Sequence, residues 1–180
     1  MRPARWMVAA ASLASASAPA VPFEVGADPG VLMREEAGGQ RSALPAIGVR
    51  GDLALAELPL GVGLSAGGEY LFAFALEGNA IGSFTQHHRL TLRPRLALAL
   101  GHAAVTLGIG PALALVSMRF KSPAGSFGTT YLRALAAGEL GFEVRLAAVR
   151  LRVRTGVMWS PGRMDVLISL GAALGLGGEP

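Results

Sequence analysis

Hydrophobic and polar side chains alternate with a period of two along most of the chain. Between Arg89 and Leu100, the sequence RLTLRPRLALAL places leucine and proline on one parity and arginine, threonine and alanine on the other. Between Val149 and Arg154, valine and leucine alternate strictly with arginine. Successive side chains of a strand point to opposite faces, whereas residues two apart on a helix lie about 200° apart around its axis. The pattern therefore predicts strands with one apolar face and one polar or small face.

The same alternation predicts about eight strands. We expect them near 23–33, 47–55, 62–76, 89–100, 104–118, 130–146, 148–159 and 164–177. Several exceed the roughly 9–11 residues that cross a bilayer as a tilted strand, so their ends should project beyond it. Long polar links at 34–45, 77–86 and 121–128 alternate with short ones. This alternation predicts a long link before the last strand, and the link 160–163 is instead short. The prediction is an all-β fold, an eight-stranded antiparallel up-and-down transmembrane β-barrel over residues 21–180.

The layout from Phe23 to Gly177 resembles small bacterial outer-membrane β-barrels of the eight-stranded type, OmpA-like in the broad sense. The resemblance rests on alternation and loop rhythm over nearly the whole chain, without a diagnostic motif. One departure is the ending GLGGEP, where members of that class commonly carry an aromatic residue that helps the assembly machinery. The resemblance implies an integral outer-membrane protein whose partners are outer-membrane lipid and, during biogenesis, the outer-membrane assembly machinery.

The first twenty residues have the order of a secretory signal peptide. Arg2 and Arg5 open the segment, an alanine-rich apolar stretch follows, and small residues offer A-x-A cleavage sites up to Ala20. This order predicts a signal peptide over residues 1–20 and export to the outer membrane. The chain has no cysteine, which excludes a disulfide scaffold, a Cys-ligated zinc site and thiol chemistry.

Composition agrees with a chain that buries most of its residues or lies in lipid. Hydrophobic residues make up 52% and charged residues 16%, against a usual charged share of about 25%. The formal net charge is +4, and two of the positive charges belong to the predicted signal peptide. Because the remaining arginines fall singly along strands rather than in a patch, we expect no nucleic-acid partner.

If the apolar face meets lipid, the polar face fills the lumen. The residues predicted to form a charge network there are Asp52, Glu69, Arg89, Arg93, Arg95, Glu139, Glu143, Arg145, Arg150, Arg152 and Arg154. Further inward positions are Glu24, Asp28, Arg50, Arg133 and Asp165. Eight strands enclose a space just wide enough for side chains to fill, and charges buried there must pair. We therefore predict a plugged structural core. A narrow channel for small solutes is the alternative, with the arginine surplus favouring anions.

Two other architectures compete with this barrel. The run from Leu96 to Met118 carries no formal charge and would suit a helical membrane protein, although its glycines and Pro111 favour a hairpin. A soluble, lipocalin-like ligand-binding barrel has the same alternation with the faces inverted, oily side chains inside and arginines outside.

The sequence contains no credible catalytic constellation. A lipid hydrolase using His87, His88 and Ser83 would lack both a G-x-S-x-G nucleophile elbow and an acid placed to orient either histidine. Three histidines without cysteine or a His-x-x-x-His spacing make no metal site. We expect no enzymatic activity and no cofactor. The predicted function is structural or surface-binding, with the three long links contacting partners.

Overall fold

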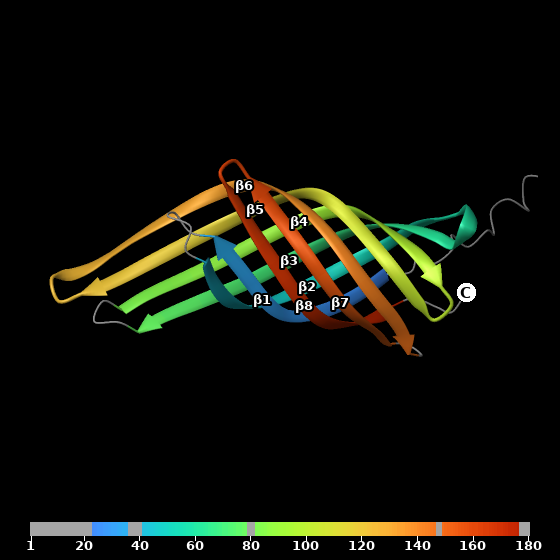
Figure 1. Ribbon diagram of the computed structural model, residues 1–180, viewed down its shortest axis with the longest axis horizontal. Coiled ribbons are helices and arrows are strands. Elements are labelled where there is room, and N and C mark those ends of the chain that lie inside the picture. Colours follow the sequence, from blue (N-terminus) through green and yellow to red (C-terminus); the bar gives the residue numbers. More distant parts are fainter. Residues whose placement is uncertain (1–22, 36–40, 79–81, 147–148, 177–180) are drawn as a thin grey trace, which may run out of the picture.

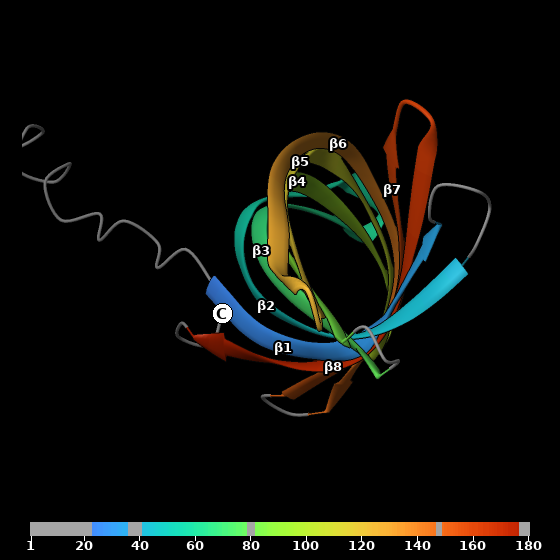
Figure 2. The same ribbon diagram turned by 90° about the vertical axis from the view of Figure 1, so that its left-hand side faces the viewer.

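The computed structural model describes residues 23–35, 41–78, 82–146 and 149–176, and the predicted signal peptide lies outside them. Each strand pairs antiparallel with its neighbours in the sequence, and the first also pairs with the last, which closes a barrel (Figures 1 and 2). This confirms the predicted all-β, eight-stranded up-and-down fold. The strands are β1 Phe23–Glu35, β2 Arg41–Leu58, β3 Val62–Gly78, β4 Gly82–Leu100, β5 Ala103–Ser122, β6 Gly125–Leu146, β7 Val149–Ser160 and β8 Arg163–Leu176.

The barrel has two distinct ends. Phe23 and Leu176 face each other at one end, where β2, β4 and β6 also end, and we call this the terminal end. β1, β3, β5 and β7 end at the opposite, distal end. Gly101 and Gly162 occupy two tight turns with φ of 66° and 76°. Glycine adopts this left-handed conformation without the steric cost that a Cβ atom brings.

At the distal end, β3 to β6 continue beyond the other strands as two long hairpins (Figure 1). β6 pairs with β7 only from Ala136 onward, so its residues 125–135 pair with β5 alone. β3 pairs with β2 only as far as Ala73, and residues 74–78 pair with β4 alone. We call residues 74–78 and 125–135, with the parts of β4 and β5 that pair with them, the distal extension.

The long polar links predicted for this end are wrong in extent. β2 already begins at Arg41 and β4 at Gly82, and only residues 123–124 separate β5 from β6. Polar side chains do not stop an antiparallel ladder, because pairing satisfies the backbone N–H and C=O groups whatever side chains they carry. The ladder therefore runs on past the apolar part of the barrel. The short link predicted between β7 and β8 is confirmed at residues 161–162.

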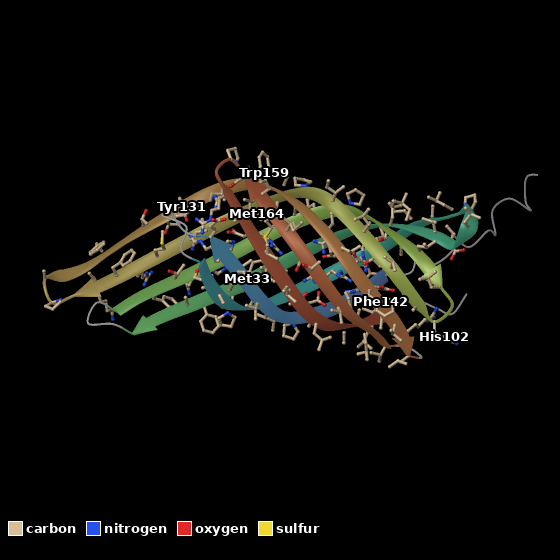
Figure 3. All side chains as sticks on the ribbon, in the orientation of Figure 1. Met33, His102, Tyr131, Phe142, Trp159 and Met164 are labelled. Atoms are coloured by element: carbon tan, nitrogen blue, oxygen red, sulfur yellow. The ribbon has the colours of Figure 1, made fainter. Side chains whose placement is uncertain are left out.

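The outer face of the barrel is apolar on all eight strands. Large apolar side chains recur there at alternate positions; Leu151 and Val153 on β7, for example, are 46% and 53% exposed. Figure 3 shows Trp159 and Met164 projecting outward from the β7–β8 hairpin. The intervening side chains point inward, because the side-chain direction of a strand repeats every second residue.

This arrangement contradicts the soluble alternative, which required oily side chains inside and arginines outside. Here the leucines cover the outer surface, and arginines such as Arg89 and Arg152 are buried in the lumen. The uncharged run from Leu96 to Met118 is the β4–β5 hairpin, as its glycines and proline predicted. No helix among the described residues is long and apolar enough to cross a membrane.

Inside the barrel, an apolar cluster lies toward the distal end. On β1, for example, Leu32 lies nearer the distal turn than the inward acid Asp28, and on β7 Met158 lies nearer it than Arg154. The sequence pattern does not identify these positions, because a leucine that faces lipid and a leucine that fills a lumen have the same residue type. The cluster consists of Leu32, Leu44, Ala46, Leu71, Ala73, Ala112, Ala114, Leu135, Ala137, Met158 and Leu167.

Candidate functional site

A buried network of charged side chains fills the middle of the lumen. Six arginines and five carboxylates from six strands are each at most 6% exposed. Alternation directs all of them inward, since they share the parity that faces the lumen on their strands. We call these eleven residues the lumen network: Asp28, Arg50, Asp52, Glu69, Arg89, Arg93, Arg95, Glu139, Glu143, Arg152 and Arg154.

Arg154 on β7 ties together four other strands. Its Nη2 lies 3.1 Å from Asp28 Oδ2 on β1, and its Nη1 lies 2.7 Å from Glu139 Oε2 on β6. Its Nε donates to the Ser169 hydroxyl on β8 at 2.7 Å. Both carboxylate oxygens of Glu69 on β3 accept from the same guanidinium. The planar guanidinium fork, with five donors, suits such a junction between facing walls.

Two glutamates each serve several arginines. Glu69 Oε2 accepts from Arg93 Nη1 at 3.0 Å, lies 3.5 Å from Arg89 Nη2, and also receives Arg154. Glu139 Oε2 lies 2.7 Å from Arg93 Nη2, and Glu139 Oε1 lies 3.4 Å from Arg50 Nη1. A charge moved from water into a low-dielectric interior costs several kcal/mol unless opposite charges and hydrogen bonds compensate it. Shared carboxylates give this compensation to six arginines with only five acids.

Toward the terminal end, the last carboxylates of the lumen network are Glu143 and Asp52. Glu143 on β6 pairs with both Arg95 on β4 and Arg152 on β7. Asp52 Oδ2 lies 2.8 Å from Arg50 Nε on the same strand. The same Asp52 oxygen lies 3.6 Å from Arg95 Nη1, so the contacts connect β2, β4, β6 and β7 and span the lumen rather than following one wall.

Glycines make room for the buried carboxylates. A Cβ atom at Gly171 on β8 would overlap the Asp28 carboxylate and lie 2.7 Å from the Ala27 carbonyl oxygen. A Cβ atom at Gly67 would overlap the Asp52 carboxylate in the same way. A strand glycine often marks such a close approach.

The lumen network closes the middle of the barrel. A water-filled passage would leave the side chains along its wall accessible to solvent, yet Arg93 is 6% exposed, Glu139 5% and Arg152 1%. Charged side chains and their mutual contacts occupy the cross-section, as the geometry of an eight-stranded barrel requires.

Nine of the eleven residues predicted for the charge network lie in it, and two lie elsewhere. Arg150 is partly exposed at the terminal end, where its Nη1 is 2.7 Å from Glu24 Oε1. Arg145 is exposed at the same end. Asp28 and Arg50, named only as further inward positions, take part instead. Parity predicts the face of a residue, but its depth along the strand decides whether it reaches the network.

A second polar group lies toward the distal end. Arg34 Nη2 donates to the Tyr131 hydroxyl at 2.8 Å, Arg133 donates to Ser160, and Arg163 Nε lies 3.2 Å from Asp165 Oδ1. Arg34 falls in the polar link predicted at 34–45, so the sequence pattern does not assign it to the lumen. The parity shared with Asp28 and Glu24 would have placed it inside.

The two adjacent histidines cannot serve one site. His87 is fully buried in the lumen, whereas His88 points to the outer face, where its Nδ1 lies 2.6 Å from the Tyr70 hydroxyl. Neighbouring strand residues face opposite sides, so the barrel wall separates the two rings. The side chain of Ser83 lies outside the described part of the structure.

A cavity of about 600 Å³ opens in the terminal end of the lumen. Its walls carry small side chains, and its floor is formed by Asp52, Arg95 and Glu143 of the lumen network. The mouth carries His102, Arg145 and Arg150. Figure 3 shows His102 at this end of the molecule. The lumen thus passes from an apolar cluster through a charged plug to an open cavity.

Several bacterial outer-membrane proteins of known structure share this fold. Ail, the attachment invasion locus protein of Yersinia pestis, superposes with a TM-score of 0.65 at 9% identity, covering 87% of this chain and 99% of Ail. Neisserial surface protein A superposes with a TM-score of 0.62 at 10% identity, covering 84% and 96%. The N-terminal β-barrel domain of Pseudomonas aeruginosa OprF gives 0.55 at 8% identity, covering 85% and 97%. No protein-family model and no curated protein sequence matches the chain. The fold is that of eight-stranded outer-membrane barrels.

Proposed function

We propose that this chain is an integral outer-membrane β-barrel with a structural or surface-interaction role. The observation that carries the proposal is that all eight strands have an apolar outer face while the lumen is charged and buried. Such a surface is costly in water, because exposed apolar area is unfavourable, and it is suited to the hydrocarbon core of a bilayer. The partners are then outer-membrane lipid along the belt and the assembly machinery during insertion.

Export in this proposal depends on residues 1–20 acting as a signal peptide. The charged start, apolar middle and small-residue end of that segment support it. The terminal end of the barrel would then face the periplasm, because short turns usually lie on that side and longer excursions on the outside.

Within this proposal the lumen network is a structural plug. Its ion pairs tie opposite walls together, and its low exposure argues against the alternative of a channel for small anions. We also propose that the chain has no catalytic role, which the separation of His87 from His88 by the barrel wall supports.

The distal extension would supply any surface interaction, in place of the long loops expected from sequence. It stands beyond the rest of the barrel, and it carries Phe120 and Phe127 as a stacked pair with ring centroids 5.1 Å apart. Phe127 is 64% exposed. An exposed aromatic side chain is a suitable anchor for a partner.

The experiment that tests this proposal is expression with the native N-terminus in a double-membrane bacterium, followed by envelope fractionation. We expect the chain in the outer membrane, and a band whose mobility in a mild-detergent gel changes on heating, because a closed barrel resists detergent until heated. Recovery as a soluble periplasmic protein, or in the inner membrane without heat-dependent mobility, would contradict it.

A further inference from the structure

The cavity at the terminal end is hollow because small residues replace the large inward side chains found deeper in the lumen. On β2 the inward positions change from Arg50 and Asp52 to Ala54, and on β4 they change from Arg95 to Ala97 and Ala99. The volume of about 600 Å³ falls in the range of roughly 300–1,000 Å³ that small-molecule sites occupy. The cavity therefore has the size and the partly apolar wall of a ligand site.

Two arginines face each other at the mouth of this cavity. Arg145 on β6 and Arg150 on β7 are directly opposite in the antiparallel register. Like charges in that position repel each other, and an anion between them would relieve the repulsion. Arg150 already has a carboxylate, since its Nη1 lies 2.7 Å from Glu24 Oε1. Arg145 is exposed and forms no ion pair with any described residue.

The backbone holds Arg145 at this position. Its N–H donates to the carbonyl oxygen of His102 in the β4–β5 turn at 2.8 Å, which also brings the His102 residue to the mouth. Three of the four acids that line the cavity are engaged, since Glu143 pairs with Arg95 and Arg152, Asp52 with Arg50, and Glu24 with Arg150. Glu57 on β2 also lines the cavity, across the barrel from Arg145 on β6. Its negative charge would repel a second negative charge on a bound molecule.

We propose that the cavity binds a small amphipathic anion, a molecule with one carboxylate or phosphate monoester group and a compact apolar body. Arg145 receives the anionic group, because a guanidinium fork matches both kinds of oxyanion. The apolar body packs against the methyl groups of Ala54, Ala97 and Ala99. The ligand enters from water, since the barrel wall separates the cavity from lipid. Ligand binding in this cavity therefore does not depend on which membrane contains the barrel.

The test uses the barrel folded in a maltoside detergent, with alanine methyl groups labelled with ¹³C, titrated with phenyl phosphate. We expect saturable shifts of the cavity alanines Ala54, Ala97 and Ala99, and none at Ala73 and Ala114 in the apolar cluster. Inorganic phosphate, which lacks the apolar body, should bind at least tenfold more weakly.

Two variants and a control distinguish binding in the cavity from nonspecific effects of the ligand on the barrel. Arg145→Gln should raise the dissociation constant at least tenfold, and Ala97→Leu, which fills the cavity, should abolish the alanine shifts. Arg119→Gln changes an exposed arginine on β5 near the distal end and should leave binding unchanged. Shifts that do not saturate, that appear equally in the apolar cluster, or that have an unchanged dissociation constant in Arg145→Gln would overturn the proposal and indicate a water-filled vestibule.

Discussion

Glu69 contacts three arginines at once, namely Arg89, Arg93 and Arg154. Replacing it by glutamine leaves Arg89 without a carboxylate within 4.0 Å among the described residues and weakens the pairing of Arg93 and Arg154. Breaking a buried ion pair by removing one partner costs about 3–5 kcal/mol. We expect Glu69→Gln to lower the free energy of unfolding by that amount, measured by urea titration with Trp159 fluorescence. Glu57→Gln, the same change at an exposed residue, should have little effect; equal losses in both variants would contradict the role of the network.

Gly171 shows how closely the backbone approaches a buried charge. Gly171→Ala would place a methyl group against the Asp28 carboxylate, so the carboxylate or the β1–β8 pairing must move. Overpacking of this kind costs roughly 1–3 kcal/mol, and we expect such a loss in the same urea titration. Gly138→Ala is the matched control, because nothing lies within 4 Å of its Cβ position. A Gly171→Ala variant as stable as Gly138→Ala would mean that the Asp28 pocket has unused space.

At the scale of the strand, one face must suit lipid and the other must suit the lumen. Leu170 lies midway along β8 on the outer face and is 62% exposed. Arginine at the bilayer midplane costs about 2–4 kcal/mol on the lipid face of such a barrel. We expect Leu170→Arg to lose that much stability in refolding experiments with lipid vesicles. Leu60→Arg, at a 93% exposed position in the Pro59–Gly61 turn, should be tolerated. If Leu170→Arg were tolerated as well, the outer face would not meet lipid.

At the scale of the whole molecule, the lumen network decides whether the barrel conducts. Its side chains occupy the cross-section between the apolar cluster and the cavity, so ions find no continuous aqueous path. We expect the purified barrel to show no stepwise conductance in a planar bilayer at neutral pH. Discrete, reproducible anion-selective steps would instead support the narrow-channel function and require the network to open.

Much of the architecture follows from alternation alone. RLTLRPRLALAL on β4 and the Val-Arg alternation on β7 predict strands, and the parity of those arginines predicts the face on which Arg93 and Arg152 are buried. Parity carries no information about depth, so it does not distinguish Arg145, which is exposed at the terminal end, from the buried residues of the lumen network. The polar composition of residues 34–45 and 121–128 predicted loops, although backbone pairing continues there as strand.

The sequence by itself determined the number of strands, their approximate positions and the alternation of side chains between two faces, because side-chain direction depends only on the local backbone. Only the tertiary structure decided which charges meet. Arg154 contacts Asp28, Glu69 and Glu139 on three other strands. These residues meet because the pairing of β1 with β8 closes the barrel and the strand register brings them to the same level. The same closure decided that the lumen is divided into an apolar cluster, a charged plug and a cavity. Each zone gathers residues from distant strands, and their common level along the barrel is set by register rather than by sequence.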